Sequence, residues 1–332
     1  MALKTEQLLT LKQLPSIGDA KVFSMANYAV DMNLSIDGIK DLLDFVNSCI
    51  SKKIVKGIKK DYQNGFDIDD MKDASNIATS IIGRSEDAGI NVVSYYDKLF
   101  PDSLKTIKTE SGKSDSPLIL YYKGSLKRLE LQNKGIAIIG TREPTSEGIK
   151  AGEYFSELFA KESFNIISGL AIGCDSSAHR GALNGSGLTT AFLAHGLDIV
   201  YPKENKDLAQ RIIDNGGLLI SEYPIGTSPM ANYFVARDRL QSGLADATLV
   251  IQTGIKGGTM HAVNATINNQ KPLFVVQYKD EAVCKHEKVQ GNMMLLAKGS
   301  AKPLTASNVD EAIKIISKAA DIKEQHSSTL FG

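Results

Sequence analysis

The sequence of 332 residues lacks the features that mark membrane, secreted and zinc-binding proteins. It has no apolar run approaching the roughly 18 residues of a membrane-spanning helix, and no charged-then-apolar leader at its start. Its three cysteines, Cys49, Cys174 and Cys284, are far apart and odd in number, which argues against a disulfide framework. No pair of cysteine or histidine residues has zinc-ligand spacing. We therefore expect a cytoplasmic protein without a metal site.

The sequence also lacks an excess of positive charge. It contains 38 lysine and arginine residues against 38 aspartate and glutamate residues, so its formal net charge is zero. Proteins that bind nucleic acid through bulk attraction usually carry a basic excess. Any binding of nucleic acid must therefore come from a local cluster of cations.

Residues 1–80 are poor in strand patterns and are predicted to form a small helical domain. Helices are expected at residues 36–51 and 70–83. The segment Leu-Pro-Ser-Ile-Gly-Asp-Ala-Lys at residues 14–21 matches a helix-hairpin-helix turn, in which the glycine lets backbone amides approach a phosphate and the lysine adds a contact. A plain connection between two helices would use the same glycine as a cap. The sequence leaves both interpretations open.

Residues 85–320 alternate between strand-type and helix-type segments, which indicates a parallel sheet built from βαβ units. The predicted fold class is α/β, an extended Rossmann-like doubly wound parallel sheet. Apolar strands such as IAII at residues 136–139 and TLVI at residues 248–251 suit a sheet covered by helices on both faces. Residues 321–332 are expected to form a short polar tail, with no winged-helix domain. The remaining strands are expected at residues 91–94, 118–122, 165–168, 189–193, 218–220 and 273–276, and the helices at residues 147–161, 176–184, 208–215, 232–243 and 260–269.

The residues after each strand matter most, because ligands of open parallel sheets bind beyond the carboxyl ends of the strands. After strand 136–139, Gly140 permits a tight turn and Thr141 can bind phosphate oxygens. Arg142 offers a two-pronged contact to an anion. This loop is therefore a candidate binding site for phosphate.

The loop after strand 165–168 is rich in small residues. Gly169 and Gly173, together with Ser168, leave backbone amides uncovered, which predicts an anion nest at the start of the next helix. The spacing fits neither the Rossmann dinucleotide fingerprint nor the P-loop. Asp175 is expected to cap that helix. Asp175 and His179 lie four residues apart, so an acid/base pair is an alternative to a capping aspartate that holds a histidine.

Cations from several loops are expected to meet at one edge of the sheet. They are Arg142, Lys203, Lys206, Arg237, Arg239 and Lys256. The last of them belongs to a glycine-rich segment, Lys256-Gly257-Gly258-Thr259, that precedes a helix. Aromatic side chains nearby offer surfaces for base stacking: they are Tyr201, Tyr223, Tyr233 and Phe234. The pattern predicts a locally basic cleft on a neutral protein.

The order of these motifs resembles the DprA/Smf family. The motifs are GTR, SGLAIGCDSSAHRGAL, YPKEN, SEYP, FVARDR and GGT, and the similarity spans residues 91–302. The resemblance implies a Rossmann-like module behind a SAM-like helical domain, and homodimers. It also implies a protein that binds and protects single-stranded DNA and loads the RecA recombinase during natural transformation. No reaction of its own and no cofactor are implied.

The resemblance also assigns individual residues. The family's DNA-contacting arginine falls on Arg142, its pocket lysine on Lys203 or Lys206, and its F-x-x-R-N-R segment on Phe234 to Arg239. The sequence departs from the family pattern with Asp238 in place of Asn, Cys174 in place of Ile, Gly257 in place of Ser, and Gln252 where Glu commonly ends the strand. The first change puts a negative charge where a phosphate or base contact is expected.

Two other functions compete with DNA binding. Phosphoribohydrolases of the same broad superfamily use a P-G-G-x-G-T-x-x-E loop, but Ala262 stands where this sequence would need the catalytic glutamate. Without that glutamate the sequence offers no convincing pair of catalytic acid and base. A nucleotide-sensing module in phage defence is the second alternative.

Overall fold

The computed structural model describes residues 3–131 and 134–330. By its internal contacts the chain divides into two compact units. The first contains the residues up to 100 together with residues 117–121, and the second contains residues 101–116 and those from 122 onward. The first unit therefore includes more than the helical segment of residues 1–80.

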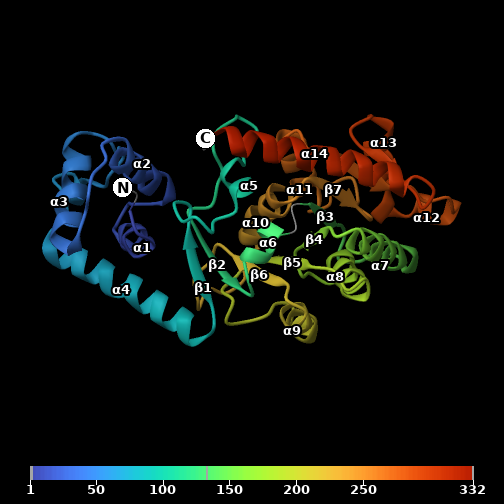
Figure 1. The fold of residues 1–332 in the computed structure, drawn as a ribbon, viewed down its shortest axis with the longest axis horizontal. Coiled ribbons are helices and arrows are strands. Elements are labelled where there is room, and N and C mark those ends of the chain that lie inside the picture. The colour runs from blue at the N-terminus through green and yellow to red at the C-terminus, as the bar shows by residue number, and fades with distance from the viewer. Residues whose placement is uncertain (1–2, 132–133, 331–332) are drawn as a thin grey trace. The chain divides into compact units, whose positions relative to one another are not determined.

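Helices make up most of the described part of the first unit. They are α1 (Thr5–Gln13), α2 (Asp19–Asp31), α3 (Gly38–Ser51) and α4 (Ile68–Asp87), with the 3-10 turn η1 (Lys60–Tyr62) and strand β1 (Asn91–Ser94). Strand β2 (Ile119–Lys123) begins in this unit (Figure 1). The predicted hairpin turn joins α1 to α2, and Gly18 is the N-cap residue of α2. The Nζ atom of Lys21 donates to the carbonyl oxygens of Ser16 and Gly57, at 2.5 and 2.9 Å, so this lysine stabilises its own unit.

A parallel sheet forms the centre of the second unit. Seven of its described strands lie in the order β6-β5-β4-β3-β7-β8-β9, and every neighbouring pair is parallel. Their bounds are β3 (Gly135–Ile139), β4 (Asn165–Ser168), β5 (Thr189–Leu193), β6 (Leu218–Ser221), β7 (Ala247–Val250), β8 (Leu273–Val276) and β9 (Lys302–Leu304). The predicted doubly wound α/β fold is confirmed.

Helices cover both faces of this sheet (Figure 1). Successive side chains of a strand point to opposite faces, so Ile138 packs with one helical layer and Ile139 with the other. The first layer contains α7 (Ser146–Lys161), α8 (Cys174–Asn184) and α14 (Val309–Leu330), and the second contains α11 (Met260–Asn268) and α13 (Gln290–Ala297). The remaining helices are α5 (Asp102–Lys105), α6 (Lys127–Leu131), α9 (Lys206–Asp214), α10 (Ala231–Leu244) and α12 (Glu281–Lys285), with the 3-10 turns η2 (Lys203–Asn205) and η3 (Glu287–Val289).

The C-terminal segment forms a helix that the sequence analysis did not predict. The expected polar tail is helical up to residue 330, as the end of α14, and residues 331 and 332 lie outside the described part of the chain. Ala312, Ile316 and Ala320 of this helix are buried. Their spacing of four residues is the helical signal that our sequence analysis overlooked. None of the helices in residues 3–131 and 134–330 has the length and apolar composition of a membrane span.

The strand order creates a topological switch point at β3. This strand pairs with β4 on one side and with β7 on the other. The connection after β3 leads to α7 on one face of the sheet, and the connection after β7 leads to α11 on the other face. A crevice at such a point is the usual ligand site of doubly wound sheets.

Candidate functional site

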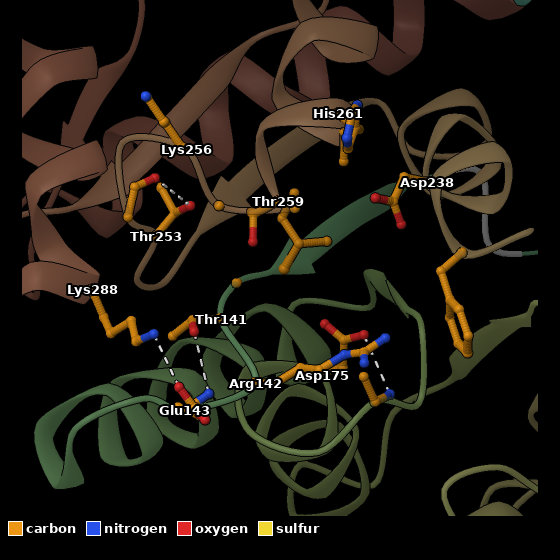
Figure 2. Close-up of a pocket in the computed structure, with 18 of the residues that line it drawn as sticks. Thr141, Arg142, Glu143, Asp175, Asp238, Thr253, Lys256, Thr259, His261 and Lys288 are labelled. Atoms are coloured by element: carbon orange, nitrogen blue, oxygen red, sulfur yellow. Dashed lines mark hydrogen bonds and ion pairs between the residues drawn. The ribbon is translucent and has the colours of Figure 1, made fainter. Parts of the chain in front are cut away.

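A cavity of about 800 Å³ lies at this switch point. Its wall consists of residues from the loop after β3, the loop after β7 and helix α10, with further residues from the loop after β4 and from η3 and its neighbours. Figure 2 shows these side chains around one hollow. Since the ligand was predicted to bind beyond the carboxyl ends of the strands, this cavity is the candidate site.

The loop after β3 supplies an exposed cation at the mouth of the cavity. Gly140 fits tightly, because a Cβ atom there would lie 2.9 Å from the carbonyl oxygen of Gln252. The chain then turns and presents Arg142, whose guanidinium carbon lies 4.9 Å from the centre of the Phe234 ring. Such a cation–π contact holds the guanidinium over the ring. Arg142 makes no ion pair with any described residue, so its charge is available to an anion.

The loop after β4 was predicted to form an anion nest, and the structure corrects this. The amides of Cys174 and Ser176 donate to the carbonyl oxygens of Thr141 and Ala171, at 3.1 Å each. The Ala171 amide donates to the Asp175 carboxylate at 3.3 Å. These donors are used inside the fold, because the loop packs directly against its neighbours. Ser168, Gly169 and Gly173 do not line the cavity.

The two glycines of this loop have structural roles instead. A Cβ atom at Gly169 would collide with the guanidinium of Arg237. Gly173 has a φ of +83° and lies where a Cβ atom would approach the carbonyl oxygens of Thr141 and Arg142 within 2.6 Å. Only glycine adopts this backbone conformation without strain. Close packing therefore explains both residues.

Asp175 and His179 do not form an acid/base pair. Gly173, not Asp175, is the N-cap residue of α8. The Nδ1 atom of His179 lies 2.7 Å from Oγ1 of Thr189, and complete burial lowers the pKa of the imidazole to about 3. Burial also raises the pKa of Asp175, an effect that the nearby Arg237 opposes. The prediction that the aspartate caps the helix and holds the histidine is wrong on both points.

Helix α10 contributes Arg237 and Asp238 to the cavity wall. The Nη1 atom of Arg237 donates to the carbonyl oxygens of Gly169 and Phe192, at 2.7 and 2.6 Å. Its Nε atom donates to Oδ1 of Asp238 at 3.2 Å. Burial raises the pKa of Asp238 to about 6, although the attraction of Arg237 works in the opposite direction. Arg237 is thus an internal structural cation as well as a lining residue.

Arg239 does not belong to the site, contrary to our prediction. Its Nη1 and Nη2 atoms donate to the two carboxylate oxygens of Glu222, both at 2.7 Å. Its Nε atom lies 3.2 Å from a carboxylate oxygen of Asp115. The residue is absent from the cavity wall. Its side chain connects α10 to the end of β6 and to the loop before β2.

The glycine-rich loop after β7 forms the opposite lip of the cavity. Lys256 is exposed and makes no ion pair with any described residue. A Cβ atom at Gly257 would lie 2.9 Å from Oγ1 of Thr253, whereas one at Gly258 would meet nothing within 4 Å. Thr259 is the N-cap residue of α11, whose N-terminus faces the cavity. The open side of Gly258 lets a ligand approach the backbone, and the helix end favours an anion.

Lys203 and Lys206 lie outside the cavity wall. Both are exposed, in η2 and at the start of α9. They follow Tyr201, whose ring centre is 5.9 Å from that of Phe234. Tyr223 and Tyr233 stack on each other, with ring centres 4.1 Å apart. The predicted basic cleft thus shrinks to Arg142, Lys256 and the internal Arg237.

Sequence reasoning missed several residues of the cavity mouth. Lys288 of η3 pairs with Glu143 at 3.0 Å (Figure 2). It also pairs with Glu287 at 3.4 Å. No local motif surrounds Lys288, and only its position after β8 pointed to this edge of the sheet. The cavity wall contains four cations and four carboxylates. They are Arg142, Arg237, Lys256 and Lys288 against Glu143, Asp175, Asp238 and Glu287.

Comparison with known proteins bears on the family and the fold. Residues 91–316 match the family model of DNA recombination-mediator protein A. A protein named Smf from Synechocystis sp. is 41% identical over 146 residues, which are 43% of this chain and 36% of that protein. Across the curated relatives, the matched stretch spans 36% to 69% of the relative's own length.

This chain is similar to solved structures of DNA processing protein A from two bacteria. The crystal structure of DNA processing protein A from Streptococcus pneumoniae has a TM-score of 0.70 at 23% identity and covers 94% of this chain and 98% of that one, which shows the fold. A structure of DNA processing protein A from Helicobacter pylori has a TM-score of 0.57 at 31% identity and covers 68% of this chain and 96% of that one. Its title describes the single-stranded DNA binding mode of that protein.

Proposed function

Because the chain belongs to the DNA recombination-mediator protein A family, which includes the DprA and Smf proteins, we propose that it binds single-stranded DNA at the switch-point cavity and catalyses no reaction. The observation that carries the proposal is the pair of exposed cations at the mouth, Arg142 and Lys256, on opposite lips. Neither forms an ion pair with a described carboxylate, although the charge of Arg142 acts on the buried Asp175, where it works against the increase in pKa that burial causes. A strand that crosses the mouth would place its phosphates between them.

Aromatic surfaces beside these cations support the same proposal. Phe234 lies under the Arg142 guanidinium, and Tyr201 lies against Phe234. Tyr201 is 45% exposed, so a base can stack on its ring. Alternating cationic and aromatic contacts are typical of proteins that bind single strands without sequence preference. Lys203 and Lys206, close to Tyr201 along the chain, would extend the contact with the backbone.

The surroundings of Asp175 and His179, the candidate acid and base, support binding without catalysis. The ring of His179 is buried and is engaged by Thr189, away from the cavity wall. Asp175 accepts from the Ala171 amide. Neither group is presented to a ligand as a proton-transfer pair. A cytoplasmic location, a homodimer and the loading of RecA during transformation are further parts of the proposal, and they rest on family membership alone.

A nucleotide sensor is the second candidate. The cavity is of the size that suits a small ligand, and its wall carries equal numbers of cations and carboxylates. Such a wall holds a single nucleotide as readily as one unit of a strand. Binding of a single nucleotide, unlike binding of a strand, requires no basic groove outside the cavity.

Fluorescence anisotropy with labelled oligomers of thymidine, alongside a thermal-shift screen of mononucleotides, separates the two. Single-strand binding predicts tight association with the oligomer and an affinity that falls steeply with salt, because bound phosphates release counterions. A sensor predicts a thermal shift with one mononucleotide and no oligomer binding. The second result would contradict the proposed function.

A further inference from the structure

Positive charge gathers in one short segment of the first unit. Residues 45–60 contain five lysines and no aspartate or glutamate, whereas residues 61–73 contain five aspartates and one lysine. Charge is therefore segregated along this part of the chain, although the protein as a whole is neutral. We refer to residues 52–60 as the lysine loop. Its lysines are Lys52, Lys53, Lys56, Lys59 and Lys60.

The fold anchors this loop and turns its lysines outward. At the end of α3, the amide of Ile54 donates to the carbonyl oxygen of Cys49 at 2.9 Å. Val55 and Ile58 are 5% and 9% exposed, so their side chains fix the loop to the core of the unit. All five lysines are exposed. The lysine loop is thus an ordered surface that presents cations to the solvent.

The predicted hairpin turn supports the loop. The Nζ atom of Lys21 donates to the carbonyl oxygens of Ser16 and Gly57, at 2.5 and 2.9 Å. The amide of Lys59 donates to Oγ of Ser16 at 3.4 Å. The lysine of the hairpin is therefore used inside the fold, and the lysine loop supplies the exposed cations beside the turn.

No carboxylate of a described residue forms an ion pair with the lysine loop. The ion pairs within the first unit use Lys4, Lys12 and Lys72 instead. The Nζ atom of Lys52 lies 5.7 Å from the centre of the Tyr28 ring and donates to its hydroxyl at 3.2 Å, which orients the ammonium and leaves its charge uncompensated. Like charges at close spacing repel each other, so an anionic partner would stabilise this surface.

Compensation of a helix dipole explains only part of the loop. Cations are favourable at the C-terminus of a helix, but the effect fades within the last turn. Helix α3 ends at Ser51, so Lys52 and Lys53 are close enough to contribute. The other three lysines of the loop lie farther along the chain. Their charge points to a partner outside the protein.

The chemistry of the loop suits phosphates and not unpaired bases. Residues 51–60 contain no aromatic side chain. The rings that flank the loop already stack within the fold, Tyr28 on Phe45 with centres 6.5 Å apart and Tyr62 on Phe66 with centres 5.0 Å apart. Sites for single strands combine cations with rings on which bases stack. Cations alone suit duplex DNA, whose bases are paired and whose phosphates carry the charge.

We propose that the lysine loop is a second DNA contact, which binds the phosphates of duplex DNA without reading its sequence. Lys56, Lys59 and Lys60 would make the contact. A Cβ atom at Gly57, between them, would meet nothing within 4 Å, so a phosphate can also approach the backbone there. The inference goes beyond the proposed function, since that function concerns the cavity of the second unit.

The test measures anisotropy with a labelled duplex of roughly 20 base pairs, which displays one charge per about 1.7 Å of its axis. The full chain is compared with a triple variant, Lys56→Gln, Lys59→Gln and Lys60→Gln. The variant should bind the duplex about tenfold to a hundredfold more weakly, and its dependence of log K on log salt should be shallower by about 0.9 for each lysine that contacts a phosphate. Binding of labelled thymidine oligomers should be unchanged.

A matched control makes the same change of charge on the second unit. It replaces three exposed lysines that form no ion pair with a described residue, as Lys302→Gln, Lys314→Gln and Lys318→Gln. Equal duplex affinities of the two triple variants would overturn the inference, as would a wild type that does not bind the duplex. An equal loss for duplex and thymidine oligomer would assign the loop to single strands and overturn it as well. Failure of the thymidine oligomers to bind any of the proteins would sink the proposed function alone.

Chemical footprinting of the wild type decides the question if the triple variant does not fold. Acetylation of lysines, read by mass spectrometry, should be slower at Lys56, Lys59 and Lys60 when the duplex is present, and unchanged at Lys302. Absence of this protection would overturn the inference. Protection by vesicles of phosphatidylglycerol and not by the duplex would assign the loop to a membrane surface, and it would overturn the inference too.

Discussion

Arg237 donates a hydrogen bond of 2.7 Å from Nη1 to the carbonyl oxygen of Gly169, and this bond ties α10 to the loop after β4. The guanidinium occupies the space that a side chain at residue 169 would need. The small residues of this loop had suggested a phosphate site here. The contact instead makes this glycine part of the scaffold that holds the cavity.

Gly169→Ala should therefore lower stability. The new methyl group must displace a buried guanidinium, a change that costs about 1–3 kcal/mol for an overpacked interior and more if the hydrogen bond breaks. Urea denaturation of the variant measures this loss. Gly254→Ala is the matched control, because its Cβ atom would have its nearest neighbour at 3.5 Å, an ordinary contact. Equal stability of the two variants would contradict the packing role of Gly169.

Arg239→Met should destabilise the protein without changing its affinity for DNA. The substitution leaves the Glu222 carboxylate, 15% exposed, without its bidentate partner. Loss of one member of a buried pair costs about 3 kcal/mol or more. Thermal unfolding and anisotropy on the same sample test both parts. A clear loss of DNA affinity in a sample that remains folded would return Arg239 to the binding site.

Short apolar runs predicted most strands of the sheet, because a strand that is buried on both faces appears in the sequence as a continuous apolar run. Strands β1, β4, β5 and β8 have the predicted bounds. Strand β9 escaped prediction because its three residues, Lys302 to Leu304, include two exposed positions and a proline. Short edge strands carry no apolar run, so only their hydrogen bonds with β8 identify them.

The site was predictable in position and only partly in composition. Strand order places the loops after β3 and β7 together, so Arg142 and Lys256 were found from the sequence alone. The sequence could not show whether an arginine faces a ligand or a carboxylate of its own fold. Arg237 and Arg239 lie two residues apart on the same helix, but they bind different partners. Arg237 donates to Gly169, and Arg239 donates to Glu222. That distinction depends on tertiary packing.

Arg142→Ala should weaken binding of single-stranded DNA by about 1–3 kcal/mol, the scale of one charge-assisted phosphate contact. Lys203→Ala and Lys206→Ala should cost less, because both lysines lie outside the cavity wall and are point charges on flexible stems. Anisotropy at two salt concentrations measures the losses. The matched control is Arg84→Ala, which removes an exposed arginine from α4. An affinity for Arg142→Ala equal to that of the control would remove Arg142 from the site.

As pH rises from about 4 to about 6, Asp238 should make a contribution that lowers the stability of the protein, whereas the buried His179, whose pKa is lowered to about 3, makes a contribution of the opposite sign. The pKa of Asp238 rises from 3.8 to about 6 through burial and through the neighbouring Asp175, while Arg237 and His261 oppose the rise. In this interval the folded protein keeps a proton on Asp238 that the unfolded chain releases, so deprotonation favours unfolding. Burial raises the pKa of Asp175 as well, which adds a contribution of the same sign.

Asp238→Asn isolates the first contribution, because Asp175 is present in both proteins. Relative to the wild type, the variant should gain up to roughly 3 kcal/mol of unfolding free energy between pH 4 and pH 7. Urea titrations across this range provide the measurement. A difference between the two proteins that stays constant with pH would show that Asp238 titrates normally.

Gly258→Ala should separate folding from binding at the glycine-rich loop. A Cβ atom at this residue meets nothing within 4 Å, and its φ is not in the left-handed region, so the fold accepts alanine. Stability should stay unchanged or rise by about 0.4–1 kcal/mol, because alanine restricts the unfolded chain. The methyl group would nevertheless stand where a phosphate approaches the backbone at the N-terminus of α11. We expect weaker binding of single-stranded DNA together with an undiminished melting temperature. Unchanged affinity would mean that the strand does not reach this loop, and the phosphate contact would then rest on Arg142 alone.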